Sequence, residues 1–451
     1  MYRPYKLPTV KASSSFTVPP PRISRLAIFI CGLLGRVYLF FIYGMAKVVL
    51  HEDAILFDSF KRALSGESRC ILAFRHPSGG EPELLSWFFL FKLKRYAAKK
   101  GVRFARDPHA LFIYGYEVIN WGGWVPRAVM PKLGAMPVHH SKIDRQGMER
   151  IINALTAGPY PVALAPEGQV SYTADAVPRL ESGVVRIGFH AAELLGRKNV
   201  SSPVEVLPLS LQFRYGPRGK IAMERLLVKI EKVTGINGPG RDKLSLTERL
   251  SQCREHVLEA NEARYNIKGD KTASFEERLD QVIKCALETG EGMIGLKGEG
   301  DLVSRMYRLR QSSWDRIVIP GTASLDGLSR VERSIKDLQA GEAWYVGRHQ
   351  EIVDFCWYFR IPLPTEDVAI HSKIEYVQNL WDFASRTMGG AYADRKRIFP
   401  RDIIIHAAPA INLSASLPSY LEDKKAAVSS AMSDLEKAYL DCIEEAGRGD
   451  F

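Results

Sequence analysis

Three short apolar runs, each followed by a turn, constrain the fold of this chain most strongly. The runs span residues 70–74, 161–165 and 204–211. Runs of this length that do not alternate with polar residues are typical of strands buried on both faces. Helical patterns lie between the runs, and strands that alternate with helices favour a largely parallel sheet flanked by helices. The sequence therefore predicts an α/β domain, whose ligands bind beyond the carboxyl ends of its strands.

The turn after the first run holds a candidate catalytic pair. His76 follows the run closely, and Glu81 comes five residues later. On a regular helix five residues correspond to about 500°, so the two side chains would point roughly 140° apart. Pro77, Gly79 and Gly80 lie between them and allow a path that is not helical. A carboxylate on one imidazole nitrogen fixes the tautomer and leaves the other nitrogen to take a proton from a hydroxyl.

The same turn also has a purely structural interpretation. Ser78 and Glu81 have the S-x-x-E spacing of a capping box, ahead of an apolar segment, 83–96, that reads as a helix. In that case Glu81 is only a carboxylate at a helix N-terminus and His76 is only a loop histidine. These residues alone leave both interpretations open.

The excess of positive charge lies in the first half of the chain. The 451 residues carry a formal net charge of +11, of which residues 1–220 contribute +15 and the remainder −4. A positive half around the candidate pair favours an anionic partner, such as membrane phospholipid, a phosphorylated substrate or coenzyme A. The sequence has no nucleic-acid-binding signature, so it does not favour nucleic acid as the anionic partner. Six cysteines without a C-x-x-C pair predict free thiols and give no case for a metal.

The N-terminal region predicts membrane association. Residues 1–25 contain five basic and no acidic residues, which predicts a disordered basic arm. Residues 26–50, within the segment 26–54, are strongly apolar but are interrupted by Arg36 and Lys47. A spanning helix needs about 20 apolar residues, and a central charge costs about 2.5–3.5 kcal/mol. We therefore expect a helical hairpin in one leaflet, on the cytoplasmic face; a soluble core helix and a single span remain alternatives.

Two further turns carry polar groups. Gly134 opens a short strand that ends near His140, and Arg145 begins the next helix. The run 161–165 leads into Pro166-Glu167-Gly168-Gln169. A carboxylate at a strand end, followed by glycine, is well placed to contact a ligand.

In this order and at this spacing, the stretches resemble the motifs of the glycerolipid acyltransferases, the family of the 1-acylglycerol-3-phosphate acyltransferases. The resemblance covers roughly residues 25–240. The family motifs are H-x4-D, G-x-I-P-V-x-R, F-P-E-G-T-R-S and V-P-[VI], and they correspond here to His76–Glu81, Gly134–His140, Ala165–Ser171 and Leu207–Leu209.

The resemblance implies acyl transfer from acyl-CoA or acyl-carrier protein to the hydroxyl of a lysophospholipid or glycerol-phosphate acceptor, with no metal or other cofactor. It implies that His76 is the general base and that Glu81 orients it. The substrate-binding residues that we expect on this basis are Ser78, His140, Arg145, Glu167, Gly168 and Gln169.

The departures from the family pattern concern the acceptor. The family's two phosphate-binding arginines are replaced here by His140 and Val170. Arg145 is a candidate substitute for one of them; the alternative is an acceptor other than a simple glycerol phosphate. Glu81 in place of aspartate preserves the chemistry with a carboxylate one methylene further out.

The remaining chain divides into a helical region and a closing segment. We expect an acyltransferase α/β domain at 55–240 and a charged helical region without chemistry at 241–400. Residues 401–451 read as a strand and a helix that return to the α/β domain, a role for which 222–260 competes. Two other functions remain open: a non-catalytic lipid-binding protein and a thioester hydrolase.

Overall fold

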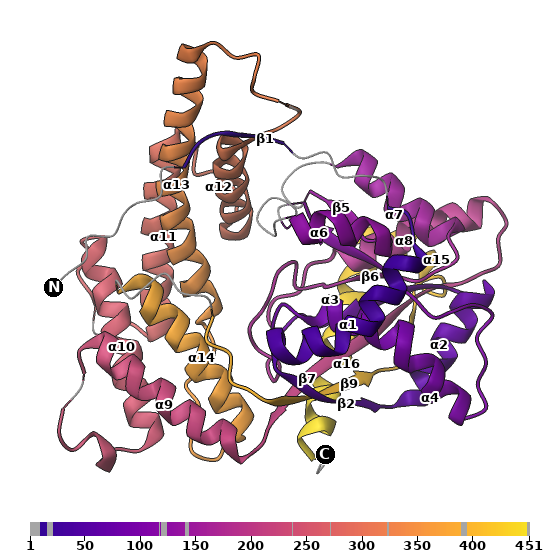
Figure 1. Cartoon of the computed structure of the whole chain (residues 1–451), viewed down its shortest axis with the longest axis horizontal. Coiled ribbons are helices and arrows are strands. Elements are labelled where there is room, and N and C mark those ends of the chain that lie inside the picture. The colour runs from indigo at the N-terminus through magenta and orange to yellow at the C-terminus, as the bar shows by residue number, and fades with distance from the viewer. Residues whose placement is uncertain are drawn as a thin grey trace.

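The fold consists of two parts that lie side by side, an α/β domain and a helical region (Figure 1). A computed structural model describes the chain at residues 10–15, 21–116, 118, 124–139, 144–236, 238–270, 272–322, 324–388 and 395–448. The helical region is inserted between two strands of the α/β domain, β7 and β9.

The α/β domain is built on a mostly parallel sheet flanked by helices, as the sequence predicts. Its strand order is β2-β9-β7-β3-β6-β4-β5. Strands β3 to β7 run parallel to one another, β9 runs antiparallel to β7, and β2 runs parallel to β9. The short β10 pairs antiparallel with β7. The strands are β2 (Met45–His51), β3 (Arg69–Phe74), β4 (Leu111–Gly115), β5 (Met136–Val138), β6 (Val162–Leu164), β7 (Val204–Tyr215), β9 (Arg401–Ala407) and β10 (Ile411–Asn412).

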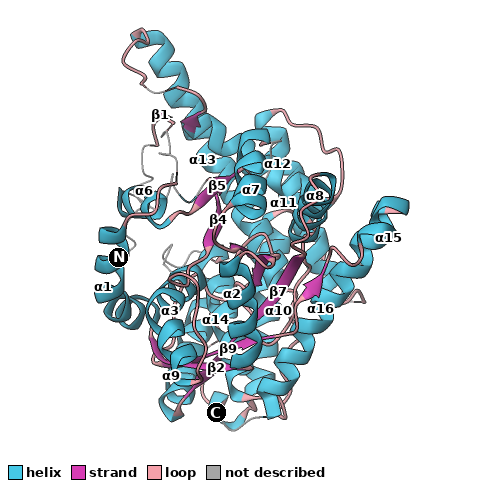
Figure 2. Ribbon diagram, turned by 90° about the vertical axis from the view of Figure 1, so that its right-hand side faces the viewer, coloured by secondary structure: helices cyan, strands magenta, loops and turns pink. Residues whose placement is uncertain are grey.

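Strand β3 lies between two apolar cores, which explains its continuous apolar sequence. Cys70, Leu72 and Phe74 face one core, and Ile71 and Ala73 face the other. Side chains alternate across a strand, so a strand covered on both faces needs apolar residues at every position. Figure 2 shows helices on both sides of the sheet. One face carries α1 (Arg25–Tyr43), α2 (Asp53–Ser65), α3 (Glu81–Phe88) and α4 (Lys94–Lys99), and the other carries α7 (Arg145–Ala157), α8 (Gly183–Arg197) and α16 (Lys424–Arg448).

Shorter elements complete this domain. A π-helical turn, Phe89–Leu93, joins α3 to α4, so the helix expected at 83–96 instead runs from Glu81 to Lys99. The others are α6 (Trp124–Val129), a 3₁₀ turn (Met130–Leu133) and α15 (Leu417–Glu422).

The helical region has an apolar core of its own. Three of its helices begin with complete capping boxes, at Ser245, Ser274 and Ser329. The expected start at residue 241 is wrong, because α9 already packs into this core through Met223 and Leu227. The helices are α9 (Pro217–Thr234), α10 (Leu246–Arg264), α11 (Phe275–Ile294), α12 (Leu302–Ile317), α13 (Arg330–Tyr358) and α14 (Ile370–Thr387), with a 3₁₀ turn at Arg241–Lys243.

The chain returns to the α/β domain through β9 and α16. Strand β7 extends past the end of β3, and its residues 209–215 pair with β9. Ile403 and Ile405 are fully buried in the core beneath α1 and α2. The hypothesis of a returning segment required these residues to lie in the main sheet, and they do. The competing segment, 222–260, belongs to the helical region.

The expected helical hairpin at 26–54 is wrong in its second half. Helix α1 ends at Gly44, whose φ of +66° suits glycine, and the chain continues as strand β2 beside β9. Arg36 does not extend toward a headgroup layer. Its guanidinium donates to the carbonyl oxygens of Met45 and Ala46, at the start of that strand.

The expected disordered arm is also wrong where the structure describes it. Ala12 is buried, and β1 (Ser13–Ser14) pairs in parallel with β8 (Val318–Ile319) of the helical region. Residues 1–9 and 16–20 lie outside the described part of the chain.

Helix α1 is largely uncovered. Among the described helices it alone is long and apolar enough to cross a membrane, judged by length and composition, and 11% of its most apolar window is buried. Gly32 and Gly35 allow it to lie close against Phe91 and Trp87. Its exposed apolar side chains are Leu26, Phe29, Ile30, Leu33, Leu34, Val37, Phe40, Phe41 and Ile42.

Candidate active site

The candidate site lies where two adjacent parallel strands end. Strand β3 leads into the turn 75–81, and β6, its neighbour, leads into the loop 165–182. Because both strands point the same way, both connections leave the same edge of the sheet.

The structure brings His76 and Glu81 into contact, in the geometry that the sequence predicts. Glu81 is the first residue of α3, and its Oε2 lies 2.7 Å from Nδ1 of His76. The same oxygen accepts a hydrogen bond of 2.8 Å from the backbone N–H of Gly79. The His76 side chain is 17% exposed, and no described protein group hydrogen-bonds to its Nε2. One nitrogen is therefore oriented and the other is open to a substrate hydroxyl.

The capping-box interpretation is wrong. The residue that caps α3 is Gly80, which has no side chain to offer. The Ser78 hydroxyl donates to Oε1 of Glu81 at 2.5 Å and accepts from Nη2 of Arg401 at 3.0 Å. Ser78 is buried, so it positions the carboxylate of Glu81 instead of binding substrate as expected.

His76 and Glu81 each shift the pKa of the other. Burial alone would lower the pKa of His76, but the hydrogen bond and charge of Glu81 outweigh it, and the net pKa is raised. Glu167 and Glu83 add smaller contributions in the same direction. Burial alone would raise the pKa of Glu81, but the hydrogen bond and charge of His76, followed by Ser78 and Arg401, lower it. The site therefore stabilises an imidazolium next to a carboxylate.

Glu167 does not face a ligand, contrary to the expectation. It is buried, and its Oε1 accepts from Nε of the fully buried Arg75 at 2.5 Å. Its Oε2 accepts from the backbone N–H of His76, also at 2.5 Å. Nη2 of Arg75 donates to the carbonyl oxygens of Thr173 and Ala176. This ion pair joins the two connections and holds the backbone of the candidate base.

Gly168 and Gln169 shape the loop after β6. Gly168 has a φ of +68°, and a Cβ there would lie 2.5 Å from Oε1 of Glu181. Only glycine fits this position without strain. Oε1 of Gln169 accepts weak hydrogen bonds of 3.3 and 3.4 Å from Arg310 of α12.

The helical region, from which we expected no chemistry, holds this loop at several points. The hydroxyl of Tyr307 donates to Glu181 at 2.5 Å. Glu375 accepts from the backbone N–H of Ala174 at 2.8 Å. Nδ2 of Asn379 donates to the carbonyl oxygen of Tyr172 at 3.0 Å. The loop is thus fixed by residues about 130 to 210 positions later in the chain.

The second motif is not next to the pair. Arg145 is exposed at the start of α7, which follows the edge strand β5. Three strand spacings separate β5 from β3, which amounts to about 14 Å. No described contact joins Arg145 to His76 or Glu81. His140 lies outside the described residues.

Sequence reasoning missed three residues beside the pair. The hydroxyl of Tyr43 donates to Oε1 of Glu83 at 3.3 Å, and the Tyr43 ring packs against Gly80. The guanidinium of Arg397 lies over the Tyr43 ring, 5.0 Å from its centre. Burial raises the pKa of Glu83, and the charge of Glu81 acts in the same direction. The charge of His76 opposes this but does not outweigh it. Only the spacing of Glu83 from Glu81 could have drawn attention to it.

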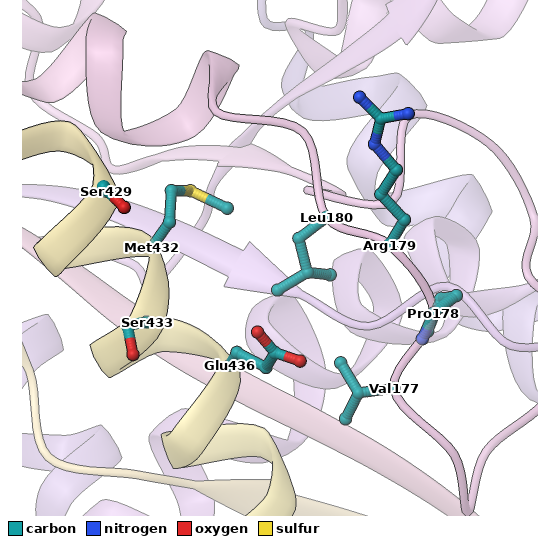
Figure 3. A pocket seen from close by; sticks show the side chains of 8 residues that line it. All are labelled: Val177, Pro178, Arg179, Leu180, Ser429, Met432, Ser433 and Glu436. Atoms are coloured by element: carbon teal, nitrogen blue, oxygen red, sulfur yellow. The ribbon is translucent and has the colours of Figure 1, made fainter. Parts of the chain in front are cut away.

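The pocket shown in Figure 3 is lined by the far end of the loop after β6 and does not include His76 or Glu81. It has a volume of about 460 Å³ and lies between residues 177–180 and helix α16. Val177, Leu180 and Glu436 face one another across it, whereas the guanidinium of Arg179 points away. Its lining offers no pairing of a base with an orienting group. The one described group with metal-ligand spacing, His51, His406 and Glu445, also lies elsewhere.

Comparison of the chain with protein-family models, with curated proteins and with solved structures gives no match. Functional inference therefore depends on the geometry of the site.

Proposed function

We propose that this protein is a membrane-associated O-acyltransferase that acylates a lysophospholipid or glycerol-phosphate-type acceptor. The observation that carries the proposal is the contact of 2.7 Å between His76 Nδ1 and Glu81 Oε2, at the carboxyl end of a central parallel strand. It leaves Nε2 of His76 without a hydrogen-bond partner among the described residues. This is the arrangement that a general base for a hydroxyl requires.

The reaction needs no covalent enzyme intermediate. The acceptor hydroxyl oxygen attacks the thioester carbonyl carbon while Nε2 of His76 takes the hydroxyl proton. The new C–O bond forms, the C–S bond breaks, and the imidazolium returns its proton to the departing thiolate. Glu81 stabilises the imidazolium between these two steps, which is consistent with the raised pKa of His76.

The exposed face of α1 supports access from a lipid surface. This helix ends at Tyr43, which contacts both Gly80 and Glu83 beside the catalytic pair. The apolar outer side chains of α1 are exposed in the free protein. A bilayer that covered them would bring a lysophospholipid headgroup close to His76.

Arg397 is the candidate that replaces the arginines absent from the second and third motifs. Its Nε is buried without a hydrogen-bond partner among the described residues, and its Nη1 makes one long contact of 3.4 Å with the carbonyl oxygen of Ile42. A phosphate of the acceptor would satisfy these donors and balance the charge.

The test of the activity is transfer of a labelled acyl group from acyl-CoA and from acyl-carrier protein to a panel of lysophospholipids. His76→Ala should lower the rate by about 10²–10⁴-fold, whereas His190→Ala, an exposed histidine on α8, should not change it. Hydrolysis of the thioester without an acceptor would identify a thioester hydrolase. Lipid binding without turnover, equal in wild type and His76→Ala, would favour a lipid-binding protein.

The test of Arg397 compares two acceptors, one with a phosphate monoester and one with a neutral headgroup. Arg397→Gln should raise KM for the phosphorylated acceptor by about tenfold or more and leave the neutral acceptor unchanged. The exposed neighbour Lys396→Gln is the matched control. Equal KM values for Arg397→Gln and wild type would remove Arg397 from the acceptor site.

A further inference from the structure

Two histidines and a glutamate lie close together near the edge of the sheet, away from the proposed active site. Strands β2 and β9 pair in parallel, with His51 and His406 opposite each other in register. Glu445 of α16 reaches the same place. In the strand order, β9 and β2 lie two and three positions from β3, so this cluster is separate from His76.

Two of the three distances between these side chains are close to those of ligands around one ion. Nδ1 of His51 lies 3.1 Å from Nε2 of His406, and that atom lies 3.1 Å from Oε2 of Glu445. All the ligand atoms lie within 4.8 Å of one another. In a tetrahedral site with bonds of about 2.0–2.1 Å, donor atoms are separated by about 3.3 Å.

Hydrogen bonds satisfy this arrangement poorly. Nε2 of His406 carries either one hydrogen or one lone pair, and it faces both a nitrogen and a carboxylate oxygen. If it carries the hydrogen, that one hydrogen is shared between the lone pair of His51 Nδ1 and the Glu445 oxygen. If it accepts from His51, its lone pair faces the Glu445 oxygen, which is repulsive. A cation between the three atoms accepts a lone pair from each of them.

The surroundings suit a divalent cation. The side chain of His406 is buried, which holds the central ligand in a fixed position. Glu52 is close enough to influence His406 and adds a second negative charge. The side chain of Glu445 is 53% exposed, which gives an ion a path from solvent.

We propose that His51, His406 and Glu445 form a structural Zn²⁺ site, with water in the fourth position. Two imidazoles and one carboxylate are ligands that Zn²⁺ accepts readily. The ion would join α16 to the edge of the sheet formed by β2 and β9. The same helix donates a hydrogen bond of 2.8 Å from the hydroxyl of Tyr439 to the carbonyl oxygen of Ala73, two residues before Arg75.

The test uses the full chain, stripped with a chelator and titrated with Zn²⁺ alone by calorimetry. We expect one equivalent per chain and a rise in the melting temperature of roughly 5 °C with excess Zn²⁺. Glu445→Gln should weaken binding by about tenfold or more, and His51→Ala should abolish it. Co²⁺ in place of Zn²⁺ should give the strong visible absorption of a tetrahedral site.

Two results would overturn the proposal. One is a wild-type protein that binds no Zn²⁺ at one equivalent. The other is binding of Zn²⁺ by wild type, Glu445→Gln and His51→Ala with equal affinity. His190→Ala is the control for adventitious surface binding, and Glu445→Gln alters an exposed residue, so loss of folding would not obscure the comparison. Because the readout is metal binding, the result is independent of acyl transfer.

Discussion

The connections that follow β3 and β6 leave the same edge of the sheet, but they hold their carboxylates differently. In the turn after β3, Glu81 faces the imidazole of His76, a side chain that is 17% exposed. In the loop after β6, Glu167 faces inward and pairs with the buried guanidinium of Arg75. One carboxylate serves a candidate base, and the other holds the backbone of that base in place.

The two connections also differ in what supports them. The turn after β3 is held largely by its own residues, with Arg401 of β9 as an added donor. The loop after β6 is held by the helical region, through residues of α12 and α14. We infer that the geometry of the His76–Glu81 pair depends mainly on nearby residues. The loop beside the pair depends on the inserted helical region.

The largest expected effect is on stability. Glu167→Ala leaves the guanidinium of Arg75 buried without a counter-ion, which should cost about 3–5 kcal/mol of unfolding free energy. Chemical denaturation measures this cost, and Glu436→Ala, at an exposed carboxylate, is the control. A variant that kept its full stability but lost acceptor affinity would break the comparison, because Glu167 would then act on substrate.

The next effect is on the pH dependence of activity. The proposed reaction needs neutral His76, and Glu81 raises the pKa of that residue above its usual value, so the acid limb of kcat/KM should lie at higher pH than for an ordinary histidine. Glu81→Gln removes this effect, so the limb should move to lower pH while the plateau falls by about 10²-fold. Glu81→Asp should restore much of both. An acid limb that Glu81→Gln did not move would contradict the pairing.

The same pair predicts a change in stability with pH. A histidine whose pKa is raised on folding adds stability below its unfolded pKa, and this contribution is lost as the pH rises through the folded value. Glu81→Gln should therefore flatten the stability profile above about pH 6.5.

A smaller effect is expected at the loop after β6. Gly168→Ala places a Cβ at a φ of +68° and against Glu181, which should cost about 1–3 kcal/mol. Gly183→Ala, at the start of α8, meets no neighbouring atom and is the control. Equal stability of the two variants would show that the loop relaxes freely.

The smallest expected effect is that of removing one contact between the helical region and the loop after β6. Tyr307→Phe removes one hydrogen bond to Glu181 and should cost about 0.5–1.5 kcal/mol. Amide exchange across 168–182 should become faster, while exchange in the turn 75–81 stays the same. Tyr345→Phe, on an exposed side chain of α13, is the control. Faster exchange in both connections would mean that they are not supported separately.

Features that depend on short spacings can be read from the amino-acid sequence. The apolar runs gave the position of the central strands, because a strand buried on both faces is apolar throughout. The five-residue spacing with glycine and proline gave the contact between His76 and Glu81. Serine and glutamate three residues apart do cap helices at Ser245, Ser274 and Ser329, but not at Ser78, where the carboxylate has a histidine partner.

Which groups turn inward and which segments lie side by side depends on long-range packing in the folded chain. An apolar stretch after Gly44 suits a membrane helix or a strand, and the presence of β9 beside it makes it β2. The side chain of Glu167 turns inward because Arg75 lies directly after the neighbouring strand β3. His51 and His406 are 355 positions apart, and the pairing of β2 with β9 brings them together, whereas the packing of α16 adds Glu445. Contacts of this kind depend on long-range packing, which local spacing does not encode.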